Sequence, residues 1–202
     1  MIYQSAQLDA MEQRYRAAFV NSLSGFKAAN LVGSCDADGQ YNLAIMSSVV
    51  HIGSHPPLLA LVLRPDDAKQ HSLQNILSQK HYTLNHVSED IFKAAHQTAA
   101  RYPKEISEFD AVGLDTQQLA DFPAPFVKAA VVKLGMLLRD HKKLEINGTH
   151  LIIGEIVLAC VPDSIIGDDG SVDIGAANTV TLSGLDSYYS TSRLARMPYA
   201  KP

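Results

Sequence analysis

Residues 42–65 read NLAIMSSVVHIGSHPPLLALVLRP, and this stretch decides the fold of the chain. Apolar residues that favour strands fill both of its halves. Ser47 and Ser48 interrupt the first half, and Pro56 and Pro57 stand between the halves. Because proline holds φ near about −65° and lacks a backbone N–H, the pair predicts a rigid return from one strand to the next. The two serines then end a strand, where their hydroxyl and backbone N–H groups are free to bind a ligand.

Strands are expected on both sides of the two serines. Upstream, AANLVGSCDADGQYNLAIMSS predicts a strand, a turn over 36–39 and a second strand. Gly39 supplies the positive φ that such a turn requires. Downstream, the run from Leu58 to Leu63 is apolar on both faces, which is typical of a strand deep in the core.

Further strands and turns follow toward the C-terminus. The expected strands are 81–87, 127–140 and 149–162, with turns at Asn147-Gly148 and at Gly170. The last segment, GLDSYYSTSRLARMPYAKP, is aromatic and basic and has little core pattern of its own. It is therefore expected to be a C-terminal tail.

Helical patterns are fewer than strand patterns. Apolar residues recur at three- and four-residue steps over residues 6–23, which predicts one amphipathic helix that Gly25 closes. Its apolar positions are Leu8, Met11, Tyr15, Phe19 and Leu23. Two shorter helices are expected over 66–79 and 88–102, the second capped by Ser88.

The order of these elements predicts the fold class. Six or more strands are separated by turns, and strands and helices do not alternate as they do in a parallel α/β sheet. We therefore expect a mainly β protein, a split antiparallel β-barrel with peripheral helices. No repeat or linker divides residues 1–202, so we expect one domain with an N-terminal helix and a C-terminal tail.

Composition narrows the classes of function. The 202 residues are 47% hydrophobic and carry a formal net charge of −4. No basic field is present, which argues against a binder of nucleic acid or of membrane surfaces. Cys35 and Cys160 form no disulfide framework. A polar N-terminus and the lack of a run of about 20 apolar residues favour a cytoplasmic protein.

Several familiar catalytic motifs are absent from the sequence. There is no G-x-G-x-x-G or G-x-x-x-x-G-K-[ST] loop for a nucleotide phosphate. The eight histidines form no H-E-x-x-H unit, and no metal site is expected. No G-x-S-x-G nucleophile elbow is found.

A group of polar residues follows the strand that the two prolines begin. Arg64 leaves that strand, and Lys69, His71, Ser72 and Asn75 span the start of the next helix. Free N–H groups and the dipole make a helix N-terminus attractive to anions, so a phosphate fits here. Taken singly, each signal has a plain alternative: solvated serines at a strand end, and ordinary helix caps.

Taken together and in this order, the motifs resemble the flavin reductase-like family of FMN-binding split β-barrels. The first motif is DADGQYNLAIMSSVVHIGSHPPLLALVLRP, and the second is HSLQNILSQKHYTLNHV. SEFDAVGL and THLIIGEIV are similar to later motifs of the family. The resemblance covers about residues 20–200.

The resemblance implies a set of site residues. Met46, Ser47 and Ser48 would meet the flavin ring and ribityl chain. The phosphate would be surrounded by Arg64, Ser72 and Asn75, with Lys69 and His71 as helpers. Asn42 would brace the turn, and His150 would lie near a nicotinamide.

The resemblance also implies a function and an assembly. FMN would be the cofactor, NAD(P)H the small-molecule electron donor, and the protein a homodimer with FMN at its interface. The tail is then expected to cross to the partner and help close the flavin site, with Tyr188, Tyr189 and Tyr199 exposed. The alternative is a tail that packs on its own barrel. Two alternatives stay open: an FMN-dependent electron carrier, and a non-enzymatic FMN-binding module.

Overall fold

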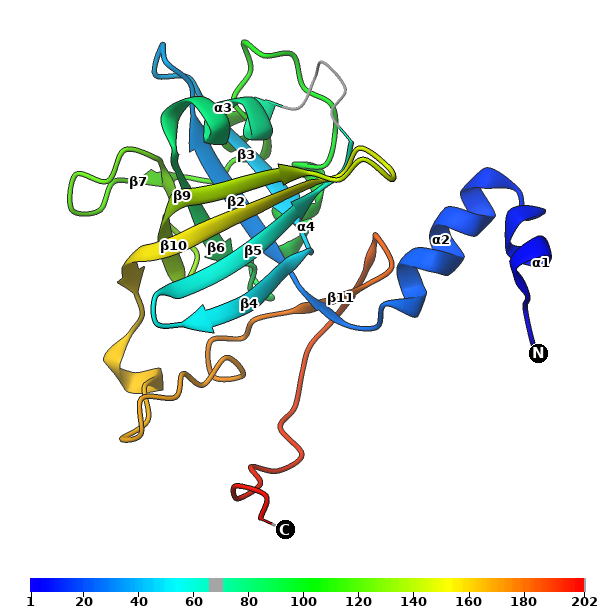
Figure 1. Ribbon diagram of the computed structural model, residues 1–202. Coiled ribbons are helices and arrows are strands. Elements are labelled where there is room, and N and C mark those ends of the chain that lie inside the picture. Colours follow the sequence, from blue (N-terminus) through cyan, green and yellow to red (C-terminus); the bar gives the residue numbers. More distant parts are fainter. Residues whose placement is uncertain (66–70, 202) are drawn as a thin grey trace.

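The computed structural model describes residues 1–65 and 71–201, and its main element is a seven-stranded sheet (Figure 1). All neighbouring strands in this sheet pair antiparallel, in the order β3-β2-β6-β9-β10-β5-β4. The strands are β2 (Asn30–Cys35), β3 (Tyr41–Met46), β4 (Val49–Ser54), β5 (Pro57–Leu63), β6 (His81–His86), β9 (Lys133–Lys143) and β10 (His150–Cys160).

The two edge strands of the sheet are consecutive in the chain. Only Ser47 and Ser48 separate β3 from β4, although the two strands lie at opposite ends of the strand order. The backbone N–H of Val62 donates to the carbonyl of Ser48 at 3.0 Å, which holds the crossing against β5. The sheet must therefore curl into a barrel, and its edges meet at the two serines without pairing along their length. This confirms the expected split antiparallel barrel.

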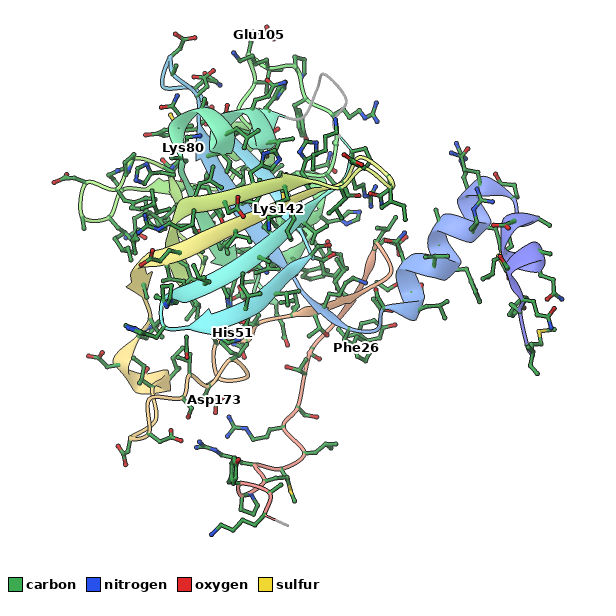
Figure 2. The ribbon with its side chains drawn as sticks, in the orientation of Figure 1. Phe26, His51, Lys80, Glu105, Lys142 and Asp173 are labelled. Carbon is green, nitrogen blue, oxygen red and sulfur yellow. The ribbon has the colours of Figure 1, made fainter. Side chains whose placement is uncertain are left out.

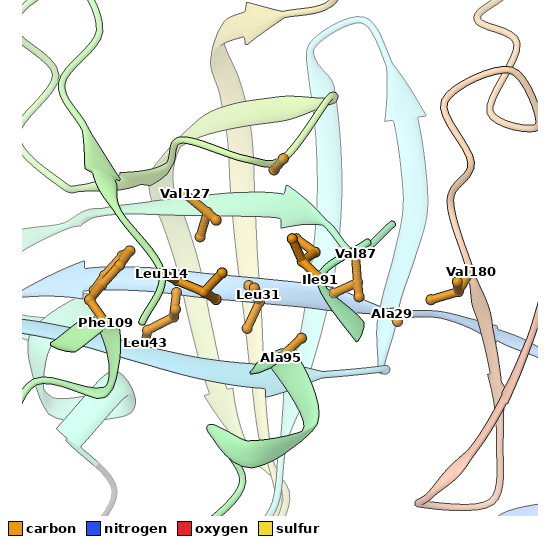
Figure 3. Close-up of a cluster of buried hydrophobic side chains, with 11 residues drawn as sticks. Ala29, Leu31, Leu43, Val87, Ile91, Ala95, Phe109, Leu114, Val127 and Val180 are labelled. Atoms are coloured by element: carbon orange, nitrogen blue, oxygen red, sulfur yellow. The ribbon is translucent and has the colours of Figure 1, made fainter. Parts of the chain in front are cut away.

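Two hydrophobic clusters lie on the two faces of the curled sheet. The barrel interior contains Val32, Leu61, Tyr82, Met136 and Ile152 with their neighbours, all buried. The second cluster lies outside the barrel, where α4 (Phe92–Gln97) and α5 (Glu108–Val112) cover β2 and β3 (Figure 3). Strand β2 is buried on both faces because it contributes to both clusters.

Short elements complete the fold. Helix α3 (His71–Gln79) packs on β2 and β3. A small sheet joins β1 (Lys27–Ala28), β11 (Thr181–Ser183) and β12 (Ser187–Tyr189), in that order. The other elements are α1 (Ser5–Asp9), α2 (Gln13–Leu23), β7 (Thr116–Gln117), β8 (Phe126–Val127) and the 3-10 turn η1 (Asp163–Ile165).

The N-terminal helix differs from the expectation. Residues 6–23 form two helices, α1 and α2, and neither has a buried residue. The carboxylate of Glu12 accepts hydrogen bonds from the N–H groups of Arg14 and Tyr15, so a new helix begins there. Both helices form an arm that projects from the barrel, with Phe26 at its base (Figures 1 and 2). The apolar stripe therefore faces no core of its own chain.

Two further expectations were wrong. Strand β5 is not buried on both faces, because Val62 is 38% exposed and no helix covers that side of the strand. Ser88 does not cap a helix, since α4 begins at Phe92 and Ser88 instead forms a bridge with Thr179. The turns at Gly39, Gly148 and Gly170 are confirmed, with φ of 85°, 72° and 80°.

None of the helices in residues 1–65 and 71–201 is long and apolar enough to cross a membrane.

Candidate functional site

A cavity of about 990 Å³ opens where the edge strands meet. One wall is the end of β3 with the crossing to β4, and another is the end of β5 with the start of α3. The rest is formed by His96 in the last turn of α4, by residues 98–104, which follow α4, and by the β11–β12 hairpin. Six of the expected site residues line it: Met46, Ser47, Ser48, Arg64, His71 and Ser72.

The polar end of the cavity is built around Ser72 in the first turn of α3. The side-chain amide of Asn42 donates a hydrogen bond of 2.8 Å to the Ser72 hydroxyl. The Ser72 hydroxyl therefore accepts from Asn42, and a hydroxyl in this state can still donate one hydrogen bond. The resemblance implied that Asn42 braces the turn. Its side-chain amide instead reaches from β3 to α3.

The outer edge of β3 is covered by two cavity residues. The N–H of Leu43 donates to the carboxylate of Glu108 at 2.9 Å, and the N–H of Ile45 donates to Thr98 Oγ1 at 2.9 Å. These bonds satisfy donors that an edge strand leaves unpaired. They also hold the strand that presents Met46 to the cavity in a fixed position.

Glu108 brings a buried carboxyl group into the cavity wall. Burial raises its pKa above the ordinary value, and the backbone N–H groups of Leu43 and Glu108 and the charge of His71 oppose this rise. The group lies at the end of the cavity where His71 and Ser72 begin α3. The sequence held no signal for this contact, which joins residues 65 positions apart.

Basic side chains stand around the same cavity. Arg64 is exposed on its rim and also borders a second, smaller hollow on the other side of the two serines. Arg101 and Lys104 line the main cavity, and Lys104 pairs with Asp36 at 3.1 Å. Charge of this kind favours an anionic group at the polar end.

Two of the expected residues, Asn75 and His150, do not belong to the cavity wall that the described residues form. Asn75 is buried one turn behind Ser72, and its amide donates to Ser34 Oγ at 3.2 Å. It supports the helix from beneath, because its position on α3 faces β2 rather than the cavity. Lys69 lies outside the residues that the structure describes.

His150 is also set back from the cavity. It lies opposite Leu63 in the pairing of β10 with β5, and Leu63 lines the cavity. Its Nδ1 atom is 2.8 Å from His141 Nε2, and the two rings stack with centroids 5.0 Å apart. His150 is therefore buried in a histidine pair at the end of the barrel.

The C-terminal hairpin supplies lining residues from a segment that was expected to help close the site, although its individual residues were not named as site residues. Leu182, Leu185, Asp186 and Tyr188 face the cavity from β11 and β12. Tyr188 was expected to be exposed, but it packs against Phe92 of its own chain with ring centroids 5.5 Å apart. The expectation was wrong because β12 pairs with β11, which brings the ring back onto α4.

The cavity suits a flat ligand with an anionic end. Its volume lies within the range of about 300–1,000 Å³ that is usual for cofactor sites. Hydroxyl, imidazole and guanidinium groups gather near the start of α3, and Met46, Leu185 and Tyr188 offer apolar surface elsewhere. The donor set contains few carboxylates, which agrees with a phosphate more than with a metal ion.

Comparison with known proteins agrees with this geometry. The sequence model described as "Flavin reductase like domain" matches residues 23–170. The chain belongs to the flavin reductase-like domain family. A crystal structure of a candidate flavin reductase with a split barrel domain from Shewanella frigidimarina is 48% identical, with a TM-score of 0.96 over 99% of this chain and 100% of that one.

More distant solved structures share the fold. Nitrilotriacetate monooxygenase component B from Bacillus cereus is 16% identical, with a TM-score of 0.87 over 98% of both chains. The 2-nitrobenzoate 2-nitroreductase of Pseudomonas fluorescens is 21% identical, with a TM-score of 0.83 over 100% of this chain and 98% of that one. This flavin reductase-like chain is accordingly an oxidoreductase with a split barrel.

Proposed function

We propose that the protein binds FMN in the 990 Å³ cavity and passes electrons from NAD(P)H through it. The observation that carries the proposal is the polar end of the cavity. There Ser72 accepts from Asn42 in the first turn of α3 and can donate to a ligand, and Arg64 lines the same cavity. These are the groups that bind phosphate.

Each wall of the cavity has a separate task in this proposal. Ser72, His71 and Arg64 hold the phosphate, while Met46, Ser47 and Ser48 lie along the ring and ribityl chain. Asn75 positions α3 from behind and does not contact the ligand. FMN, when bound, supplies the hydride and electron chemistry. The chain therefore needs to bind and orient the flavin and to exclude water, and requires no acid–base pair of its own.

The position of the electron donor stays a prediction. A contact of His150 with the nicotinamide would require the donor to reach the barrel end beyond Leu63, because His150 does not line the cavity. A cytoplasmic location agrees with the two half-buried free cysteines.

A homodimer is part of the same proposal. The arm of α1 and α2 has no buried residue, and an isolated helix of 11 residues is marginal in water. Phe26 at its base is 66% exposed, and Tyr199 in the tail is 90% exposed. Burial of these apolar groups against a second copy would stabilise both ends of the chain.

The test is binding followed by turnover. Purified protein is titrated with FMN and followed by quenching of flavin fluorescence, with one site per chain expected. NADH or NADPH is then added without oxygen, and bleaching of the flavin absorbance at catalytic rates supports the reductase. Binding without bleaching would support the electron-carrier alternative, and absence of FMN binding would contradict the proposal.

A further inference from the structure

The β11–β12 hairpin is an addition to the part of the chain that matches the family. The family match ends at residue 170, whereas the hairpin spans residues 181–189. It is held in place by pairing with β1 and by contacts of Tyr188 with α4. This part of the cavity wall therefore lies outside the residues that the family model matches.

Tyr188 makes one specific polar contact in the wall. Its hydroxyl lies 3.0 Å from Nδ1 of His96, a residue in the last turn of α4, and the two rings meet edge to face at 5.6 Å. Both residues line the cavity. The contact joins positions 92 residues apart and is the means by which the hairpin reaches α4.

A protonated phenol can donate to an imidazole nitrogen or accept from it, and the contact between Tyr188 and His96 fits either direction. Burial, and then the charge of Asp186, raise the pKa of Tyr188 to about 12, so the hydroxyl keeps its proton at neutral pH. A phenol proton directed at Nδ1 requires that nitrogen to be an acceptor, and the ring proton of neutral histidine then resides on Nε2. Among the described residues, the His96 ring makes no other hydrogen bond.

We propose that Tyr188 is a positioning residue that holds His96 as an Nε2–H donor facing the cavity, where it binds an acceptor atom on the ring of the flavin. This inference rests on the proposed function. The polar edge of the isoalloxazine ring carries several acceptor atoms and a single N–H group. A hydrogen-bond donor held in a fixed position therefore orients the ring. The same donor favours the reduced flavin, which carries more negative charge than the oxidised form.

The tautomer is measured directly and without flavin. Nitrogen-15 NMR is recorded on the ligand-free protein at a pH where histidine is neutral, and the His96 signals are assigned by comparison with His96→Leu. The spectrum is expected to show the Nε2–H tautomer of His96. Tyr188→Phe keeps the ring and removes the hydroxyl, so the signals should move toward a mixture of tautomers. Phe92→Leu is the matched control: it loosens the packing around Tyr188 but leaves the hydroxyl, and the Nε2–H tautomer should remain.

Binding provides the second readout. His96→Leu should lower the affinity for oxidised FMN by about two- to tenfold, the effect of one neutral hydrogen bond. It should lower the affinity for reduced FMN more. An Nδ1–H tautomer in the unmodified protein would overturn the inference, as would equal affinities of His96→Leu and the unmodified protein for reduced FMN. If the unmodified protein binds no FMN, the proposed function fails, and the role of His96 toward the flavin fails with it; the NMR result then stands as a separate statement about Tyr188.

Discussion

The side-chain amide of Asn42 and the hydroxyl of Ser72 form a 2.8 Å hydrogen bond that ties the edge strand β3 to the first turn of α3. The two residues are 30 positions apart, and both line the cavity. The Ser72 hydroxyl can still donate one hydrogen bond, so it should matter for the phosphate of FMN and little for riboflavin.

Ser72→Ala is expected to lower the affinity for FMN by about ten- to a hundredfold, because a hydrogen bond to a charged group is worth roughly 1.5–3 kcal/mol. Ser78→Ala is the matched control, since Ser78 is exposed on the same helix and does not line the cavity. Fluorescence titration of both variants with FMN and with riboflavin checks the expectation. Equal losses in the two serine variants would place the phosphate elsewhere.

Arg64→Ala should lower the affinity for FMN by about ten- to a hundredfold and the affinity for riboflavin much less, since only FMN offers a phosphate to the guanidinium. Arg64→Lys keeps the charge and loses the forked geometry, so its affinity for FMN should lie between those of the unmodified protein and Arg64→Ala. Because Arg64 is exposed, neither change should unfold the protein. Equal losses for the two flavins would show that Arg64 does not contact the phosphate.

Gly154→Ala is expected to destabilise the barrel by about 1–3 kcal/mol. A Cβ at Gly154 would lie 2.2 Å from the hydroxyl oxygen of Tyr82, which is buried and has no hydrogen-bond partner among the described residues. Tyr82→Phe removes that oxygen and should cost little, and the double variant should recover most of the loss. Urea unfolding of the four proteins measures this coupling, and additive losses would argue against it.

Glu108→Gln should alter how stability depends on pH. Because the pKa of Glu108 is raised in the folded protein, the folded state binds its proton more tightly than the unfolded chain does. The free energy of unfolding of the unmodified protein therefore falls as pH rises from the ordinary carboxyl range through the raised pKa. The glutamine variant lacks this loss of stability, so its stability relative to the unmodified protein should rise as pH increases from the ordinary carboxyl range through the raised pKa. Urea unfolding across this range tests it, and a constant difference would contradict it.

Truncation separates the hairpin from the tail. A chain ending after Ser190 keeps Tyr188 and the cavity wall and loses Tyr199, so the dimer should weaken while FMN binding by the remaining dimer persists. A chain ending after Ser183 also loses Leu185 and Tyr188, and its FMN affinity should fall as well. Sedimentation and fluorescence titration measure the two properties. A chain ending after Ser190 that dimerises as tightly as the full chain would rule out a role for the tail.

Much of the barrel could be predicted from the sequence because its signals are local. Alternation, strand propensity and turn glycines act within a few residues, so strands β3, β5, β6 and β10 and the turns at Gly39 and Gly148 were expected where they occur. The strand expected over 127–140 overlaps β9, which begins later, at Lys133. Ser47, Ser48 and Ser72 could be proposed as site residues for the same reason, since each stands at the end or the start of an element, and all three line the cavity.

Tertiary structure alone decided which distant residues meet. An apolar stripe shows that a helix has an apolar face but not what covers it, so the arm of α1 and α2 could not be placed. Glu108 reaches β3 across 65 positions, and Tyr188 reaches His96 across 92. Contacts of this kind depend on how the sheet curls and on which strands become its edges. The spacing of residues along the chain does not encode which distant residues meet.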